Sequence, residues 1–344
     1  MSSWKECKLG EVLELKYGKD HKALNDGNIP VFGSGGVMRY ADTSLYDDES
    51  ILIPRKGTLS NIFYINEPFW TVDTIFWSKI NKKEAFGKFL FYQLKTIDFA
   101  NLNVGSAVPS LTTKVLNEVD ISLPVLEEQK AIAEVLSSFD DKIDLLHRQN
   151  QTLESLAQTL FRQWFIEEAK EKWEIGTFDD LVEVSSGKSL KRELFDDMGK
   201  YEVLGANGKI GKTNEWLFEE KLIYTGRVGT LGNVFLIDED KKVWLSDNTL
   251  VVKPKKYFYF IYFLMIDFQL ENLNVGSTQP LVRQSDLKNI EISLPNDEIV
   301  LIFEQQSKDI FKKINQNKKQ IQTLENLRDT LLPKLLSGEI KIKD

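Results

Sequence analysis

Residues 101–106 read NLNVGS, and residues 272–277 repeat the same six letters at an offset of 171, from 101 to 272. Two tetrapeptides, ISLP and QTLE, also return at this offset, at 121–124 and 292–295 and at 151–154 and 322–325. Each copy therefore carries the same segments in the same order. A repeat of this length indicates two similar domains, since solenoid repeats are much shorter.

Upstream of NLNVGS the repeat continues with small shifts in offset, as loop insertions would cause. The matched residues are Trp4 with Trp173, Gly18-Lys19 with Gly187-Lys188, and Gly57-Thr58-Leu59 with Gly229-Thr230-Leu231. The two copies thus share a frame and differ in their loops. Two similar but non-identical modules suit a target that has two similar but non-identical halves.

Composition narrows the class of protein. The 344 residues suffice for two domains of ordinary size, and 42% hydrophobic residues exclude general disorder. No apolar run approaches the roughly 18 residues that a membrane-spanning helix needs, and Met1–Trp4 followed by charges does not resemble a signal peptide. We expect a soluble cytoplasmic protein. One cysteine and two histidines exclude an internal disulfide and a Cys/His metal cluster, so no metal is expected.

The net charge of -8 and the pI near 5.2 argue against a chain that holds nucleic acid by its positive charge alone. Neutralising phosphates requires clustered lysine and arginine side chains. The charge leaves open a binder whose basic residues are local, or one whose partners in a complex supply much of the charge.

Each copy begins with a mixed module. Residues 4–124 carry short apolar runs, such as 50–54 and 61–65, broken by Gly, Pro, Asn and Asp. This pattern predicts strands and turns with a few short helices, including one over residues 86–96. Residues 173–295 repeat the pattern, including an aromatic stretch that matches this helix. The fold class predicted for each module is α+β.

A long helix follows each ISLP. From Glu127 there is no Pro or Gly before Gly176, which predicts one helix of about 40 residues and roughly 60 Å. Its apolar positions are spaced four and three apart, the a/d pattern of a coiled coil. The first seam is Ile132, Leu136, Phe139, Ile143, Leu146, Asn150, Leu153, Ala157, Leu160 and Trp164. The second is Phe303, Ser307, Ile310, Ile314, Asn317, Ile321, Leu324, Arg328, Leu331 and Leu335.

We expect the two helices to pair antiparallel. Setting Asn150 against Asn317 also opposes Ile143 to Leu324, Leu146 to Ile321, and Leu136 to Leu331. A buried asparagine pair in an apolar seam would fix the register at a cost in stability. The alternative is that either asparagine faces solvent where the seam splays. An apolar outer face, formed for instance by Leu145, Leu156 and Phe161, would need a partner to cover it.

No catalytic constellation is present in the sequence. The glycine-rich stretch 32–36 resembles a cofactor loop of S-adenosylmethionine enzymes, but such a lone loop is a weak signal and turn glycines explain it better. The carboxylate runs 47–49 and 238–240 lack the spaced Asp, Glu and Lys of two-metal chemistry. Neither histidine has a nucleophile at a motif spacing. We therefore expect neither an active site nor a cofactor.

Polar side chains that suit base edges or phosphates gather in the loops of both modules. The candidate DNA-binding residues are Arg39, Arg55, Lys56, Asn61, Thr112, Thr113 and Lys114 in the first module and Lys209, Lys212, Arg227, Asn233, Gln279, Arg283 and Gln284 in the second. Each alone is also explained as a solvated loop residue. Residues shared by both modules, such as Arg55 and Arg227, suit phosphate contact or scaffold, whereas differences must carry specificity.

Three segments carry a resemblance to a known family. They are Leu123-Pro124 with Glu127-Glu128-Gln129-Lys130-Ala131-Ile132-Ala133, then Leu160 to Phe165 (LFRQWF), then Leu331 to Ile340 (LLPKLLSGEI). Together they resemble the specificity subunit of type I restriction-modification systems, over the whole chain. Two departures stand out: Glu298-Ile299-Val300-Leu301 replaces the Glu-Gln signature in the second helix, and the shared motifs Gly57-Thr58-Leu59 and Gly105-Ser106 with Pro109 do not say which bases are read.

The resemblance implies two target-recognition domains, 1–124 and 169–295, each of which reads one half of a split site in double-stranded DNA. It implies that the helices, at 125–168 and 296–344, form an antiparallel pair related by a pseudo-two-fold repeat and set the spacing of the half-sites. It also implies two DNA adenine methyltransferase subunits as partners, restriction subunits in the full nuclease, and no catalysis by this chain.

Two other functions remain possible on the sequence alone. In the first, the modules bind other proteins and the helices form a scaffold that holds them apart; steep weakening with salt would distinguish DNA binding from such an apolar interface. In the second, the glycines at 32–36 serve a cryptic methyltransferase, which requires cofactor binding by the isolated chain.

Overall fold

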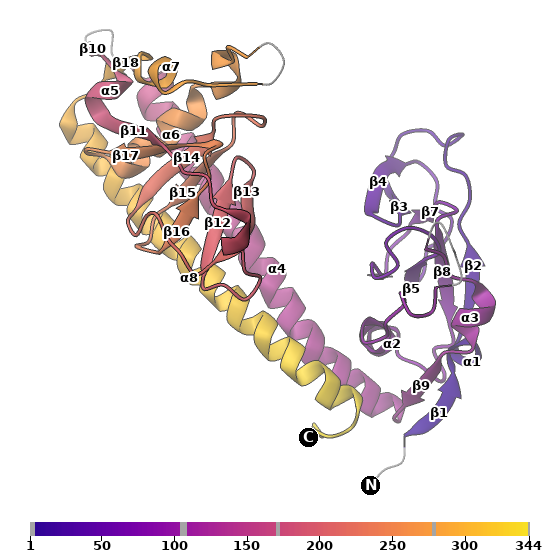
Figure 1. The fold of residues 1–344 in the computed structure, drawn as a ribbon. Coiled ribbons are helices and arrows are strands. Elements are labelled where there is room, and N and C mark those ends of the chain that lie inside the picture. The colour runs from indigo at the N-terminus through magenta and orange to yellow at the C-terminus, as the bar shows by residue number, and fades with distance from the viewer. Residues whose placement is uncertain (1–3, 104–108, 170–172, 277–279, 343–344) are drawn as a thin grey trace. The chain divides into compact units, whose positions relative to one another are not determined.

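The computed structural model describes residues 4–103, 109–169, 173–276 and 280–342. The chain divides into two compact units. Unit 1 comprises Met1–Leu145 with Gln320–Asp344, and unit 2 comprises Leu146–Lys319. Each unit combines one mixed module with a stretch of each long helix, and the predicted α+β class is confirmed (Figure 1). Among the described residues, no helix is long and apolar enough to cross a membrane.

In its described residues, the first module contains three small sheets and three short helices. Its elements are β1 (Lys5–Lys8), α1 (Leu9–Val12), β2 (Leu13–Tyr17), β3 (Ile29–Gly33), β4 (Gly36–Ala41), β5 (Ser50–Pro54), β6 (Phe63–Ile65), β7 (Trp70–Thr71), β8 (Ile75–Ile80), α2 (Gly87–Lys95), α3 (Thr113–Asn117) and β9 (Asp120–Leu123). The sheets have the strand orders β1-β9, β2-β8-β5-β6 and β4-β3-β7. The strand predicted at 50–54 and the helix predicted at 86–96 are thus confirmed as β5 and α2.

The second module repeats this topology strand for strand. Its elements are β10 (Glu174–Thr177), α5 (Phe178–Leu181), β11 (Val182–Ser186), the 3-10 helix η2 (Arg192–Leu194), β12 (Tyr201–Gly205), β13 (Gly208–Thr213), β14 (Leu222–Gly226), β15 (Val234–Ile237), β16 (Val243–Leu245), β17 (Thr249–Pro254), α6 (Phe258–Asp267), the 3-10 helix η3 (Leu270–Leu273), α7 (Gln284–Lys288) and β18 (Glu291–Leu294). The orders are β10-β18, β11-β17-β14-β15 and β13-β12-β16. β5 and β14 are buried along their whole length, as their apolar sequences favour.

Each module begins and ends on one antiparallel strand pair. β1 pairs with β9, with Cys7 opposite Ile121, and β10 pairs with β18, with Gly176 opposite Ile292. ISLP therefore contributes the closing strand of each module, and the long helix begins two residues after its proline. The repeated tetrapeptide marks the junction between module and helix.

The long helices are α4 (Leu126–Arg162), which continues into a π-helical turn η1 (Gln163–Glu167), and α8 (Asp297–Leu336). Every predicted seam position in both helices is buried or half-buried. In unit 2, Asn317 Nδ2 donates to Asn150 Oδ1 at 2.8 Å, and Phe161 meets Phe303 with ring centroids 5.9 Å apart. Residue numbers rise along α4 from Asn150 to Phe161, while their partners on α8 fall from Asn317 to Phe303. The two helices are therefore antiparallel here.

Unit 1 shows the same direction of pairing. Arg328 donates to Asp140 at 2.7 Å, and Leu136 lies in the same apolar cluster as Leu331 and Leu335. This cluster also includes Phe89 of α2, so the module and the helices share one core. Burial of this apolar surface is the main force that holds the module on the helices.

The prediction that Phe161 belongs to an exposed outer face is wrong. Its side chain is 1% exposed, whereas Leu145 and Leu156 are about half exposed, at 51% and 47%. Phe161 packs against Phe260 and Phe263 of α6. The aromatic α6 covers this side of α4, which periodicity within α4 alone does not reveal.

Candidate nucleic-acid interface

In the first module, backbone hydrogen bonds hold three loops together around Arg55. Its N–H donates to Thr74 O at 2.8 Å, and its carbonyl accepts from Leu111 N at 2.9 Å. Nearby, Gly57 N donates to Pro109 O at 3.2 Å. The loops after β5, before β8 and before α3 are therefore fixed to one another without using side chains.

The second module makes the same bonds at the repeat positions around Arg227. Its N–H donates to Asn248 O at 2.8 Å, its carbonyl accepts from Val282 N at 2.9 Å, and Gly229 N donates to Pro280 O at 3.0 Å. We call each set of three loops a loop cluster. The repeated backbone pattern is a scaffold common to both modules.

The backbone conformation explains why the repeated Gly-Thr-Leu motif begins with glycine. Gly57 has φ 88° and Gly229 has φ 86°, a left-handed conformation that glycine adopts at little cost. A side chain at either position would strain the turn that follows the arginine. The motif therefore specifies the shape of the loop cluster.

Side chains differ on this common scaffold. In the first module the Arg55 guanidinium lies 5.3 Å from the centre of the Tyr17 ring and donates to Asp73 O at 3.1 Å. In the second, Arg227 donates to Ser186 Oγ at 3.5 Å. Tyr17 and Ser186 occupy the same place, since each precedes a repeated Gly-Lys pair.

A second contact joins each loop cluster to the neighbouring hairpin. Asn61 Nδ2 donates to the Ser34 carbonyl at 3.3 Å in the β3-β4 turn. In the second module, Asn233 donates to Asn207 at 2.9 Å, and Asn207 donates to Thr230 at 3.2 Å, in the β12-β13 turn. The hairpin turns are thus held at the edge of both clusters by an asparagine at the same repeat position, which donates to a backbone carbonyl in one module and to a side chain in the other.

The structure brings most of the predicted DNA-binding residues into the two loop clusters or next to them. Those in the clusters or at their edges are Arg55, Lys56, Asn61, Thr112, Thr113, Lys114, Arg227, Asn233, Arg283 and Gln284. The others lie on hairpin strands: Arg39 on β4, and Lys209 and Lys212 on β13. Gln279 lies outside the described residues.

Several of these side chains already have protein partners. Arg39 pairs with Asp26 at 2.7 Å, Lys209 lies 3.5 Å from Glu202, and Thr112 accepts from Val115 N as the N-cap of α3. Arg55 and Arg227, by contrast, donate to uncharged oxygens, so their charges are not neutralised by these bonds. The two arginines shared by the modules therefore suit contact with an anion.

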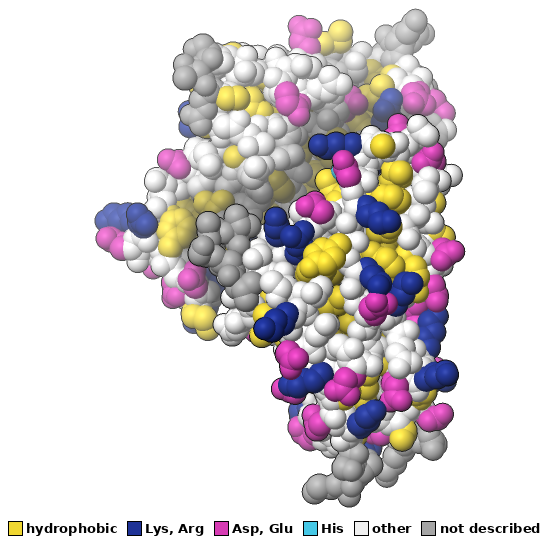
Figure 2. All heavy atoms as spheres, turned by 90° about the vertical axis from the view of Figure 1, so that its right-hand side faces the viewer, with side chains coloured by type: hydrophobic (Ala, Val, Ile, Leu, Met, Phe, Trp, Pro, Cys, Tyr) yellow, Lys and Arg dark blue, Asp and Glu magenta, His cyan; other side chains and the backbone are white. Residues whose placement is uncertain are grey.

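On the face that Figure 2 draws, charge is mixed rather than concentrated. Figure 2 shows Lys and Arg side chains interspersed with Asp and Glu, with hydrophobic side chains between them. A binder of this kind obtains little affinity from a broad positive field.

The sequence analysis missed Tyr17 and Ser186, the side chains that contact the shared arginines. A signal was available, because the residue before each repeated Gly-Lys pair differs between the copies. It also missed the roles of Ser34 and Asn207, which sit in the glycine turns of the two hairpins. Comparing the residues that flank each matched motif would have identified both pairs.

The departure from the Glu-Gln signature in the second helix has a structural explanation. In unit 1, Gln129 is fully buried and accepts from Phe86 N, just before α2, at 2.8 Å. Val300 replaces it in unit 2, but Glu304, four residues later, accepts from Phe260 N at 2.6 Å. Four residues are about one helical turn, so Glu304 caps α6 from the same face of the helix.

Glu304 differs from Gln129 in charge. Burial raises the pKa of the Glu304 carboxyl to about 7, while hydrogen bonds from the backbone N–H groups of Phe260, Tyr259 and Phe258 oppose the rise. The junction of module and helix in unit 2 therefore contains a carboxyl that titrates near neutral pH, where unit 1 has a neutral amide.

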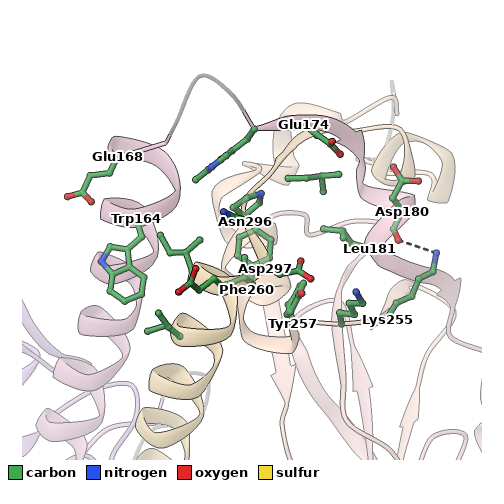
Figure 3. Close-up of a pocket in the computed structure, with 18 residues that line it drawn as sticks. Trp164, Glu168, Glu174, Asp180, Leu181, Lys255, Tyr257, Phe260, Asn296 and Asp297 are labelled. Atoms are coloured by element: carbon green, nitrogen blue, oxygen red, sulfur yellow. Dashed lines mark hydrogen bonds between the residues drawn. The ribbon is translucent and has the colours of Figure 1, made fainter.

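A hollow in the described part of the chain is separate from the loop clusters. It measures about 1140 Å³ and lies in unit 2 between the end of α4, β10 and the start of α8. Figure 3 shows Trp164, Tyr257, Phe260 and Asp297 around it. A smaller hollow of about 410 Å³ occupies the repeat position in unit 1 beside Trp4. None of the predicted DNA-binding residues lines either hollow, so both are features of the junctions.

Comparison with known proteins matches both copies of the repeat to one family model. The model is described as the type I restriction modification DNA specificity domain, and it matches residues 1–155 and 170–328. A type I restriction enzyme specificity subunit (MjaIX) from Methanocaldococcus jannaschii is 28% identical over 90% of this chain and 81% of its own length. A putative type I specificity subunit from Mycoplasma pneumoniae is 25% identical over 92% of this chain and 94% of its own length.

Among solved structures, the chain is similar to the type I restriction-modification S subunit from M. genitalium. The TM-score is 0.68 and the identity is 20%, over 96% of both chains. At this identity the likeness concerns the fold, and it extends over nearly the full length of both proteins.

Proposed function

Since this chain belongs to the family of type I restriction-modification DNA specificity subunits, we propose that it selects the DNA sequence on which its complex acts. Each module reads one half of a bipartite site in double-stranded DNA, with residues 1–124 and 169–295 as the two recognition domains. Two methyltransferase subunits, and restriction subunits in the full complex, supply the catalysis. The chain itself contributes no catalytic residue.

The observation that carries this proposal is the pairing of an identical backbone scaffold with different side chains. Both loop clusters repeat the same three backbone bonds, yet Tyr17 faces one arginine and Ser186 the other. Backbone and shared arginines suit contacts that position DNA, while the differing side chains suit contacts with base edges. Two modules that recognise two different half-sites require shared contacts for positioning and different contacts for specificity.

We assign Arg55 and Arg227 to phosphate contact and the remaining loop residues to base or phosphate contact. The proposed set is Arg39, Arg55, Lys56, Asn61, Thr112, Thr113, Lys114, Lys209, Lys212, Arg227, Asn233, Gln279, Arg283 and Gln284. Replacing Arg55 by Ala is expected to weaken binding on all sequences and to reduce its salt dependence.

The long helices, 125–168 and 296–344, act as the spacer between the half-sites, with Asn150 and Asn317 fixing their register. Half-sites about one helical turn apart lie roughly 34 Å between centres. Inserting one heptad into each helix lengthens the pair by about 10 Å and should favour a gap longer by about three base pairs. An unchanged gap in such a variant would contradict the spacer role.

The direct test is base-resolved sequencing of modified adenines in cells that express this chain with and without its methyltransferase partner. A split motif that requires both proteins supports the proposal and identifies the site. If no adenine is modified although the methyltransferase is active with another specificity subunit, the protein-binding scaffold is favoured. In that case, binding of the partner proteins should not weaken as salt rises.

A further inference from the structure

We propose that Gln284 reads an adenine in the half-site of the second module, and that Ser186 positions its amide for this contact. The inference rests on the proposed function and deepens it by naming a base and a reader. It starts from Arg227 and Gln284 at the loop cluster of unit 2 and from Ser186 at the adjoining end of β11.

Gln284 is the first residue of α7 and is half-buried. Its Nε2 donates to Ser186 Oγ at 2.9 Å, and Ser186 is the one hydrogen-bond partner that the described residues give this side chain. One hydrogen of the amide nitrogen is therefore used, while the other hydrogen and the carbonyl oxygen Oε1 stay available. Oε1 is not one of the fully buried side-chain atoms without a partner, so part of its surface is accessible.

The free groups match adenine. In the major groove adenine presents N7 as an acceptor beside the N6 amino group as a donor, and a glutamine amide answers both with one N–H and its carbonyl. Guanine presents two acceptors, so the carbonyl of Gln284 would face O6 without a hydrogen between them. Recognition by Gln284 thus distinguishes adenine from guanine by chemistry as well as by shape.

Ser186 is held in place from a second side. Arg227 Nη1 donates to Ser186 Oγ at 3.5 Å, and the Arg227 carbonyl accepts from Val282 N at 2.9 Å, two residues before Gln284. The bonds connect the end of β11, the loop after β14 and the start of α7. A glutamine side chain has three rotatable bonds to fix, so this brace lowers the entropy lost when the base is bound.

The first module lacks this arrangement. Thr113 occupies the position of Gln284, and Tyr17 that of Ser186. A threonine hydroxyl pairs with either donors or acceptors and cannot make the two-bond contact with adenine. The difference therefore assigns the adenine to the half-site of the second module alone.

The test uses the full chain with its methyltransferase subunits, and it reads the modified motif together with competition binding of duplexes altered one base pair at a time. Gln284→Ala should reduce the preference for adenine at one position of one half-site from about tenfold or more to below threefold. That position is the adenine that is read, which is distinct from the adenine that is methylated. The other half-site should stay fully specified, which also shows that the variant is folded and assembled.

Two further variants separate reading from a merely structural effect. Ser186→Ala should relax the same position and no other, because Ser186 acts through Gln284. Gln305→Ala, an exposed glutamine on α8 that bonds to Asp309, is the matched control and should leave the whole motif unchanged.

Retention of every adenine preference in Gln284→Ala would overturn the inference while leaving the proposed function intact. So would relaxation of different positions by Ser186→Ala and Gln284→Ala. If the unaltered chain yields no motif with an active partner, the proposed function itself fails. The outcomes are therefore distinguishable.

Discussion

The two units fill equivalent positions of the helix pair with side chains of different polarity, charged in unit 1 and apolar in unit 2. In unit 1, Arg328 donates to Asp140 at 2.7 Å, and Asp140 also accepts from the Tyr92 hydroxyl at 2.7 Å. At an offset of 171 the positions of Asp140 and Arg328 correspond to Phe311 and Ala157 in unit 2, both buried in the apolar cluster. One repeat closes its helix seam with a charged network, the other with a large and a small apolar side chain.

The repeated backbone thus accommodates either a charged network or apolar packing at the same positions of the helix pair. Replacing a buried ion pair by well-packed apolar residues is often neutral or stabilising, whereas removing one partner is costly. The expected consequence is that single substitutions affect the two units through different physical causes, and unit 2 should depend most on volume.

The largest expected effect concerns volume at one heptad position. Phe303 and Ile132 occupy the same place in the two copies and are both buried. Phe303→Ala should lower the free energy of unfolding of unit 2 by about 3–5 kcal/mol, because it removes ring contacts with Phe161, Trp164, Phe165 and Phe263. Chemical denaturation combined with hydrogen exchange measures it.

The matched variant Ile132→Ala should cost about 2–4 kcal/mol and loosen unit 1 instead. Hydrogen exchange assigns each loss to its unit. Equal protection losses in both units for either variant would contradict the division into two separately packed cores.

The second effect depends on pH and tests the two caps, Glu304 and Gln129. Because the folded-state pKa of Glu304, about 7, lies above its ordinary value of 4.5, folding takes up a proton between these values. Stability contributed by this carboxyl is therefore present at low pH and lost as pH rises through about 7. Glu304→Gln should remove this loss, stabilise unit 2 at pH 8 by up to about 3 kcal/mol, and flatten its pH profile.

The reciprocal variant Gln129→Glu should introduce a loss of the same sign into unit 1. Thermal unfolding between pH 5 and pH 8 measures both variants. Lower stability of Glu304→Gln at pH 8 would show that the charge of the carboxylate at the start of α6 outweighs its desolvation.

The smallest expected effect concerns the charged network of unit 1. The Arg328 and Asp140 side chains are 23% and 28% exposed, so solvent screens the pair only in part. Arg328→Ala should cost about 1–2 kcal/mol, because Asp140 loses one of its two partners. A double-mutant cycle with Asp140→Ala measures the coupling by denaturant unfolding. A coupling energy near zero between Arg328 and Asp140 would show that the charged network does not stabilise unit 1. The two units would then differ only in how deeply these positions are buried.

The sequence predicted the features that depend on periodicity. The offset of 171 defined two modules of equal topology, and heptad spacing located both helices and the asparagines that meet at 2.8 Å. Such features are visible because each residue of a regular helix has a fixed direction. The loops also supplied Arg55, Thr113, Arg227 and Gln284 as candidates, although nothing in their spacing showed which of them lie together.

The remainder depended on contacts between segments distant in the chain. The burial of Phe161 depends on α6, about 100 residues later, and the cap by Glu304 depends on where the start of α6 lies against α8. Likewise, the pairing of Gln284 with Ser186 joins residues 98 apart. Spacing within one element carries no information on such contacts, and the loops that make them have no period.

The strand pairs β1-β9 and β10-β18 have a consequence for how new specificities arise. Because the first and last strands of each module are hydrogen-bonded neighbours, the whole module is an insert whose two ends meet at one place. Segments with adjacent ends are readily exchanged between proteins. Recombination at Lys5–Lys8 and Asp120–Leu123 would therefore replace one reader as a cassette while the helix pair stays untouched, so a cell could change half of its recognition sequence in a single event.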